Sequence, residues 1–319
     1  MPLNDMQVFN NQVQVVATET VAQAVRRFNE ASGGAMVLGD QTHIGDFLEE
    51  ASYKLIANLV NRRDAYADGD VSSQNIQQLL DRSVKVDSRV GPVRYTAEQF
   101  RRLGKSPEES GLVIGEQAAE AMIQDYLNTA IGAAVNAIED ADQGGDLVHD
   151  GSGSKPTLKL LNRAAALFGD RSQALVAWVM TGQAFHDIIE ERIDNQNRLF
   201  EIGNISVVTD GLGRRFVVTD SPQLTTDDSV PLQRVVGLTP GGIAVQTAPM
   251  ISETDTQTLK ENIAYIWQGE YSFTVGLNGY SWNDAAKRSP TDAQLFDGTN
   301  WDKVVTSNKD TAGVVLLAD

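Results

Sequence analysis

Residues 106–145 read SPEESGLVIGEQAAEAMIQDYLNTAIGAAVNAIEDADQGG, and this stretch decides the fold. Its first four residues, 106–109, form a helix start, because a serine caps the first turn, a proline suits the first helical position and a glutamate three residues on completes a capping box. Gly144 and Gly145 provide the stop. The pattern therefore predicts one helix much longer than the usual length of about 11 to 12 residues.

This predicted helix has one broad apolar face and one narrow polar face. At about 1.5 Å per residue the rod would be on the order of 50 Å long, so we expect the spine of an extended protein, with core scaffolding of an ordinary domain as the alternative. The apolar positions are Ala119, Ile123, Leu127, Ile131, Ala134, Val135 and Ile138. The polar row, expected to face solvent, is Glu116, Glu120, Gln124 and Asn128. Such a charged row argues against a membrane span.

Composition narrows the function classes. The chain has 319 residues, no cysteine and a formal net charge of −17. This acidity argues against tight binding of DNA or RNA, which needs a basic face, and the lack of cysteine excludes disulfides and thiolate metal sites. The charge is uneven, because residues 26–105 hold 12 Lys or Arg against 11 Asp or Glu, whereas residues 106–319 hold 14 against 30. Residues 1–12 show no signal peptide.

Little core is predicted before the long helix. Residues 1–17 show no sustained period and are expected to be an extended arm, followed by a short helix from Thr18 or Thr20 to Phe28. Residues 35–104 change pattern often, and the elements predicted there are a strand at 36–38, helices at 47–62 and 73–82, and extended chain at 84–95. Few large apolar residues lie between the arginines of the last stretch, so we expect a protruding loop there. These arginines are Arg82, Arg89, Arg94 and Arg101.

A compact α/β region is predicted after the long helix. Residues 146–155 read as a flexible connector rich in Gly and Ser. The expected elements are a helix at 156–168, a buried strand at 174–180 and a helix at 181–195. Two hairpins are expected next, one joining 205–209 to 215–219 and one joining 234–238 to 243–247. The last elements are a long strand at 262–279 with a bulge at Gly269, and a strand at 313–317 that pairs with it.

No catalytic, cofactor-binding or metal-binding residues are predicted. His43, His149 and His186 are scattered without partners at metal-ligand spacing, and there is no phosphate-binding loop, dinucleotide fingerprint or nucleophile elbow. A group of aspartates lacks the bidentate glutamate of a calcium loop and reads as a solvated helix end. These aspartates are Asp140, Asp142, Asp146 and Asp150. The C-terminal aromatic residues are expected to form the core of a β layer rather than a sugar-binding platform. They are Trp267, Tyr271, Phe273, Tyr280, Trp282 and Trp301.

The order of these segments resembles the major capsid proteins of tailed bacteriophages, whose HK97-like fold is shared with encapsulins. Residues 212–222, LGRRFVVTDSP, are similar to a strand of that family, and residues 235–243, VVGLTPGGI, to the hairpin that follows it. The segments QGEYSF at 268–273 and GTNWDK at 298–303 are similar to phage capsid C-termini. The resemblance covers most of the chain from about residue 105 onward.

The resemblance implies an α+β HK97-like capsid fold with five parts. Residues 1–34 would be an N-terminal arm and residues 35–105 an extended loop with its base. Residues 106–145 would be the spine helix of a peripheral domain, with its polar row facing solvent or the lumen of a shell. Residues 146–250 would form an axial domain, and residues 251–319 the peripheral β element and the C-terminal strand.

The implied function is a structural subunit, not an enzyme, that needs no cofactor. It would self-assemble as pentamers and hexamers into the icosahedral head of a tailed phage enclosing double-stranded DNA. The implied partners are other copies of the chain, separate scaffolding, portal and decoration proteins, and packaged DNA contacted weakly and non-specifically, with no membrane. The protein would assemble in the host cytoplasm and belong to the virion. Lys85 and Lys105 lie in or beside the loop, where some family members cross-link a lysine, but nothing around them singles them out.

Two alternatives remain at the level of the sequence. An encapsulin-like shell shares the fold but encloses cargo enzymes instead of a genome. A soluble α/β enzyme or sugar-binding protein belongs to another class, and would be a monodisperse monomer with a small-molecule ligand.

Overall fold

The structure is a computed structural model that describes most of the chain. The described residues are 3–39, 45–53, 62, 65–66, 68–70, 78–96, 98–99, 102, 106–140, 146–190, 197–202, 205–209, 215–226, 230–258, 261, 263–283 and 288–319.

The predicted long helix is confirmed as α3 (Pro107–Glu139), which has 33 residues. Its capping box is complete, because the backbone N–H of Glu109 donates to Ser106 Oγ and the backbone N–H of Ser106 donates to Glu109 Oε2, each over 3.2 Å. The helix ends at Glu139, earlier than the predicted stop at Gly144 and Gly145, which lie outside the described residues.

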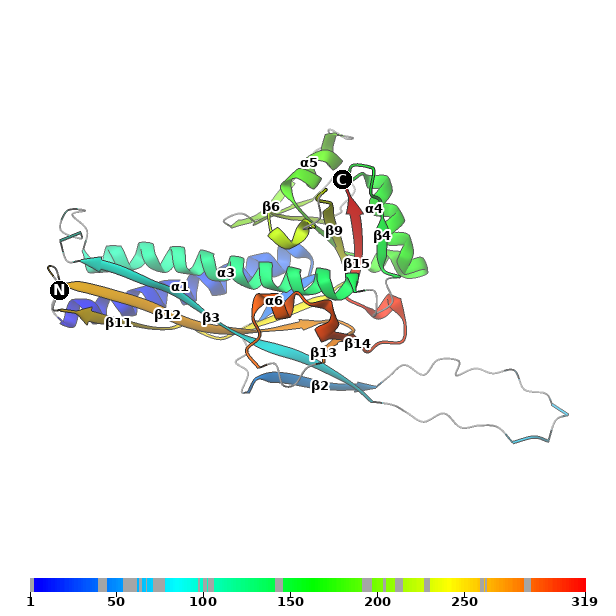
Figure 1. Ribbon diagram of the computed structural model, residues 1–319, viewed down its shortest axis with the longest axis horizontal. Helices are drawn as coiled ribbons and strands as arrows, with labels where there is room; N and C mark the ends of the chain where they lie inside the picture. The colour runs from blue at the N-terminus through cyan, green and yellow to red at the C-terminus, as the bar shows by residue number, and fades with distance from the viewer. Residues whose placement is uncertain are drawn as a thin grey trace.

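A second long helix, α1 (Leu3–Ser32), lies alongside α3 (Figure 1). The prediction of an extended arm at 1–17 and a short separate helix is therefore wrong. The buried residues of α1 include Phe9, Val13 and Ala17, which recur every four residues and pack in the common core. Polar Asn and Gln residues between them hide this period in the sequence. The two helices approach closely at Gly115, where a Cβ atom would lie 3.0 Å from the carbonyl oxygen of Val13.

One face of an eight-stranded sheet packs against this helix pair. Its central path runs β1 (Met36–Gly39), β10 (Ile243–Thr247), β12 (Ala264–Leu277), β13 (Tyr280–Trp282) and β14 (Trp301–Lys303). The long strand β12 lies between β11 (Ile251–Gln257) and β3 (Gln78–Thr96), and β2 (Phe47–Tyr53) pairs with the first part of β3. The predicted strand at 36–38, the extended chain at 84–95 and the long strand at 262–279 are thus confirmed.

Three predictions for this region are wrong. Residues 47–53 and 78–82 are strands rather than helices, because they pair with each other as an antiparallel ribbon. The remaining parts of the predicted helices, 54–61 and 73–77, lie outside the described residues. The bulge is also misplaced. The register changes from Trp267 opposite Val93 to Gly269 opposite Val90, so the extra residue lies in β3, at Gly91–Pro92, and not at Gly269.

A seven-stranded sheet forms the second layer. Its order is β4 (Val148–Asp150), β15 (Gly313–Ala318), β9 (Gln233–Leu238), β5 (Ala177–Met180), β8 (Arg215–Thr219), β7 (Ile205–Thr209) and β6 (Asn197–Ile202). The helices α4 (Leu158–Ala165), followed by η2 (Ala166–Ala174), and α5 (Gly182–Glu190) lie where helices at 156–168 and 181–195 were predicted. The predicted hairpin of 205–209 with 215–219 is confirmed as β7 and β8.

Three connections in this sheet differ from the prediction. The second hairpin does not exist, because β9 pairs with β15 and β5, whereas β10 pairs with β1 and β12 in the other sheet. The last strand, β15, pairs with β9 and β4 and not with the long strand β12. The connector at 146–155 contains the strand β4. The C-terminal aromatic residues are buried, as predicted for the core of a β layer.

Candidate assembly surfaces

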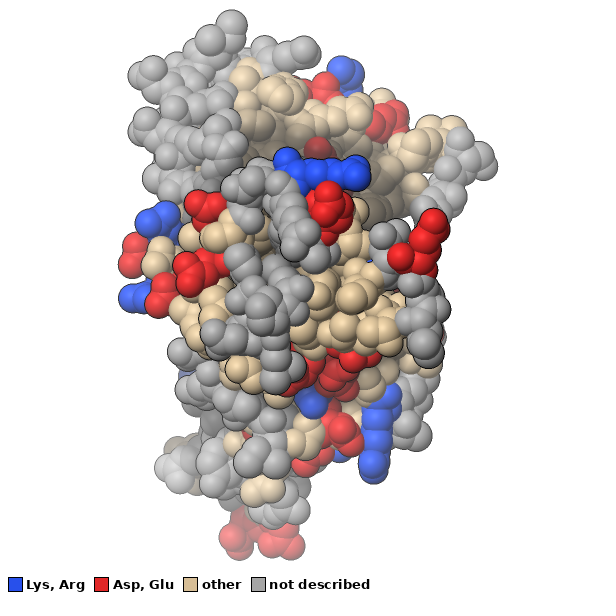
Figure 2. All heavy atoms as spheres, turned by 90° about the vertical axis from the view of Figure 1, so that its left-hand side faces the viewer, with Lys and Arg blue, Asp and Glu red and all other residues tan. Residues whose placement is uncertain are grey.

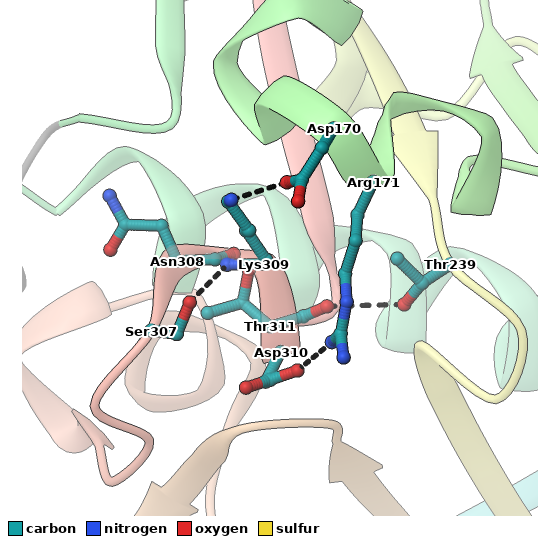
Figure 3. Close-up of polar contacts among 8 residues, drawn as sticks. All are labelled: Asp170, Arg171, Thr239, Ser307, Asn308, Lys309, Asp310 and Thr311. Atoms are coloured by element: carbon teal, nitrogen blue, oxygen red, sulfur yellow. Dashed lines mark hydrogen bonds and ion pairs between the residues drawn. The ribbon is translucent and has the colours of Figure 1, made fainter. Parts of the chain in front are cut away.

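The two sheets meet where β9 ends and β10 begins. Thr239 lies at this crossing, where its backbone N–H donates to the carbonyl oxygen of Ala312 over 2.9 Å. Its hydroxyl donates to the carbonyl oxygen of Thr311 over 3.1 Å (Figure 3). A Cβ atom on Gly242 would lie 2.6 Å from the carbonyl oxygen of Ala312, so only glycine fits there. The crossing is therefore closely packed, and it fixes one sheet relative to the other.

Two ion pairs lie beside the same crossing (Figure 3). Asp170 pairs with Lys309, and Arg171 pairs with Asp310, which joins η2 to η5 (Asn308–Asp310). The hydrogen bond from Lys309 holds the pKa of the Asp170 carboxyl below its usual value. A hollow of about 690 Å³ lies beside these pairs, and Arg171 and Lys309, the cations among its described lining residues, are both engaged by carboxylates.

The β2–β3 ribbon projects from the main body (Figure 1). Glu49 and Arg82 form an ion pair of 2.7 Å on it, whereas Glu50 lies directly opposite Asp81. Burial and the charge of Glu50 together raise the pKa of Asp81 to about 6. Lys85, on the same ribbon, pairs with Asp87 over 3.1 Å. Lys105 lies outside the described residues.

The polar row of α3 borders solvent rather than a dry core. Glu116 is exposed, and Glu120, Gln124 and Asn128 are half-buried. The hydroxyl of Thr219 in the seven-stranded sheet donates to Asn128 Oδ1 over 3.5 Å, so the end of the row also touches the second layer. The expectation that the row faces solvent is met most clearly at Glu116.

The titratable residues considered from the sequence do not come together. His149 lies on β4 and His186 on α5, whereas His43 and Asp142 are outside the described residues. Within the described part of the chain, no group of three or more His, Asp or Glu side chains is arranged to hold a metal ion. None of the described helices is long and apolar enough to cross a membrane.

Charge is mixed on the end of the molecule that carries the start of α1. Figure 2 shows that acidic side chains form several clusters there, with basic side chains lying singly beside them. Among the described residues on this side there is no broad basic face. Such a surface gives no footprint for tight binding to phosphate groups.

The open edges of the eight-stranded sheet differ in whether side chains bind their backbone atoms. On β1, the side-chain amide of Asn29 binds both backbone groups of Leu38. It accepts from the N–H of Leu38 over 2.9 Å and donates to the carbonyl oxygen of Leu38 over 2.7 Å. On β11, the amide of Asn10 donates to the carbonyl oxygen of Ser252 over 2.7 Å. Beyond the end of β2, by contrast, no described strand pairs with the outer edge of β3.

Sequence reasoning missed these edges as functional features. In the sequence, the arginines of β3 indicate only a protruding loop. The acidic residues of β11 lead to no prediction. The available signal was the placement of Arg89 and Arg94 beside valines in β3, and of Glu253 and Asp255 at every second position of β11. Only the pairing of both strands with β12 places the two charged rows on one surface.

The described part of the chain is a long helix pair lying along a long sheet, with a second sheet and a projecting ribbon, and it presents charged surfaces and sheet edges. The sequence model of the Gp13-like family, described as major capsid protein 13-like, matches residues 5–315, so the chain belongs to that family. It is a phage major capsid protein, a structural part of the virion and not an enzyme.

Solved capsid structures are similar to this chain at low sequence identity. The capsid asymmetric unit of cyanophage Pam1 matches with a TM-score of 0.51 and 12% identity, over 92% of this chain and 92% of that chain. The capsid of Ralstonia phage GP4 gives a TM-score of 0.46 and 10% identity, over 89% and 87% of the two chains. The mature capsid of bacteriophage PhiM1 gives 0.45 and 12%, over 90% and 86%. No curated protein matches the sequence.

Proposed function

We propose that this chain forms pentamers and hexamers that build the icosahedral head of a tailed phage and enclose double-stranded DNA. The observation that carries the proposal is the match of nearly the whole chain, residues 5–315, to a major capsid protein family. The Pam1 capsid similarity supports the fold part of it. Pentamers and hexamers are the units from which an icosahedral shell closes.

The two layers support an assignment of domain roles. We assign the peripheral domain to the eight-stranded sheet with α1 and α3, the extended loop to the β2–β3 ribbon, and the axial domain to the seven-stranded sheet. The C-terminal strand β15 then belongs to the axial sheet, because it pairs with β9. Rings would form around the axial domains, and the projecting ribbon would lie over a neighbouring subunit.

The acidic chain suits a container for DNA. With a formal net charge of −17, a wall of such subunits would repel phosphate groups and let the packaged DNA move without adhering. Separate scaffolding, portal and decoration proteins, and assembly in the host cytoplasm, complete the proposal. An encapsulin-like shell around cargo enzymes is the second candidate, since it has the same fold.

Electron microscopy of the purified full chain tests the proposal. We expect shells, tubes or capsomers with fivefold and sixfold symmetry, and nuclease-protected DNA in particles recovered from infected cells. Small uniform shells that contain enzymes and no DNA would favour the encapsulin-like alternative. A chain that stays a monodisperse monomer at high concentration, also with a scaffolding protein, would refute both.

A further inference from the structure

Opposite edges of the long β3–β12–β11 sheet carry opposite charges. The residues of β12 alternate regularly, so Tyr265, Trp267 and Tyr271 face the helix pair and are buried. Residues directly opposite one another in antiparallel strands share a face. Arg94, Ile266 and Asp255 therefore form one row across the other, outer face.

A second basic residue and a second acidic residue extend this arrangement. Arg89 lies opposite Glu270 on the outer face of β3, and Glu253 lies opposite Gln268 on β11. The basic side chains Arg89 and Arg94 and the acidic side chains Glu253 and Asp255 are all exposed. None of these four forms an ion pair with a described residue.

The basic residues of the β3 edge and the acidic residues of the β11 edge lie at matching heights along the strands. Asp255 is level with Arg94 because both lie opposite Ile266. Glu253 is level with the Gly91–Pro92 bulge, between the rows of Arg89 and Arg94. The strands β3 and β11 also run in the same direction, since each is antiparallel to β12. A second copy placed beside the first would therefore bring acidic side chains opposite basic ones.

Backbone features indicate that side chains, not strand addition, make this contact. Pro92 has no backbone N–H and lies in the bulge of β3, which interrupts pairing along that edge. On β11, Asn10 already binds the carbonyl oxygen of Ser252, and the backbone N–H of Thr256 donates to Asp255 Oδ1 over 2.8 Å. The second carboxylate oxygen of Asp255 remains for an arginine.

We propose that the β3 edge, through Arg89 and Arg94, binds the β11 edge of a second copy, through Glu253 and Asp255. The contact is head-to-tail, because two different surfaces meet, and repeated copies of it form either a closed ring or a filament. This inference rests on the proposed function and specifies which surfaces of neighbouring subunits meet. Screening by salt weakens contacts between exposed charges, so the interaction weakens at high ionic strength.

Disulfide trapping tests the contact, because the natural chain has no cysteine. The full-length double variant R94C/D255C is purified and oxidised. Within one chain these positions are separated by the whole of β12, about 10 Å, whereas a disulfide needs Cα atoms closer than about 7 Å. We expect a ladder of covalent oligomers beyond the dimer on a non-reducing denaturing gel, and its loss under reducing conditions.

The matched control is K159C/D255C, in which the first cysteine moves to an exposed position on α4. We expect no ladder from this control. Charge exchange adds a second readout: R94E and D255R should each reduce assembly measured by sedimentation, and the double variant R94E/D255R should restore it. Restoration would not follow if either substitution only damaged the fold.

The outcomes separate this contact from the proposed function. Shells in the micrographs without a ladder from R94C/D255C would overturn the edge contact and leave the shell function standing. A ladder without shells would support the contact and count against the shell. Equal ladders from R94C/D255C and K159C/D255C would also overturn the proposal, because they would reflect random collision.

Discussion

Arg234 and Glu139 form a bidentate ion pair that joins the long helix to the second sheet. The guanidinium Nη2 and Nε atoms of Arg234, on β9, lie 2.7 Å and 2.9 Å from the carboxylate oxygens of Glu139, in the last turn of α3. Arg234 Nη1 also donates to the carbonyl oxygens of Gln223 and Thr225. With 15% and 18% of the two side chains exposed, water screens this pair only weakly.

Replacing Arg234 with alanine should destabilise the chain by about 3 kcal/mol, since it leaves a half-buried carboxylate without its partner. Burial already raises the pKa of Glu139, and Arg234 opposes that shift. The shift of the urea unfolding midpoint measures the loss. The control is R102A, which removes an exposed ion pair with Glu98 and should change stability by less than about 1 kcal/mol. Equal effects of the two variants would contradict the structural role of Arg234.

Asp81 should make stability depend on pH. Its pKa is raised to about 6 in the folded chain, above the value of 3.8 in the unfolded one. The folded state therefore binds the proton more tightly, so the stabilisation is complete below pH 3.8 and is lost as the pH rises through about 6.

Asp81→Asn removes this titration and should stabilise the chain at pH 8 by about 1 kcal/mol after allowing for solvent screening. At pH 4 the gain should be much smaller. Unfolding midpoints of both proteins at the two pH values provide the measurement. The control is D87N, which neutralises an exposed aspartate on the same strand. A gain independent of pH would rule out Asp81 as the cause.

Gly313→Ala should disrupt the pairing of β15 with β9. A Cβ atom at this position would lie 1.9 Å from the carbonyl oxygen of Gly237, and both are backbone positions that cannot rotate away. We expect a loss of about 3 kcal/mol or a failure to fold. Gly69→Ala is the control, because nothing lies within 4 Å of its Cβ position. Thermal unfolding of the two variants, or their soluble yields, should differ clearly.

Phe9→Ala should destabilise the chain by about 3 to 5 kcal/mol, because the side chain is fully buried between α1 and the rest of the core. Asn11→Ala, at an exposed position on the same helix, should be nearly neutral. Urea unfolding measures both. If the two variants were equally stable, α1 would not belong to the subunit core, and the expectation of a coreless arm would regain support.

The two helices illustrate what sequence patterns reveal and hide. The start of α3 combines a serine cap, a proline and a glutamate within four residues, so local chemistry is enough to place it. In α1 the row of Phe9, Val13 and Ala17 is narrow and surrounded by Asn, Gln and Thr. Its stability comes from packing along α3, which no local pattern displays.

The two expected hairpins show the same limit for strands. The segments 205–209 and 215–219 pair with each other, as their alternation and the turn residues between them predict. The segments 234–238 and 243–247 carry equally good signals around Pro240, Gly241 and Gly242, yet they belong to different sheets. A Pro-Gly-Gly turn serves a hairpin and a crossing between layers equally well, and the partners that decide between them lie far away in the chain.

The sequence alone determined the long helix with its cap, several strands such as those of the 205–219 hairpin and the long strand at 264–277, the aromatic core and the acidity of this capsid protein, because each depends on residues close together or on composition. Only the tertiary structure decided which strands pair, where the β3 bulge lies, that residues 3–32 reach into the core as α1, and that oppositely charged edges lie level across β12. Those features depend on contacts between residues far apart in the chain, and a linear pattern of polar and apolar residues does not specify the partner.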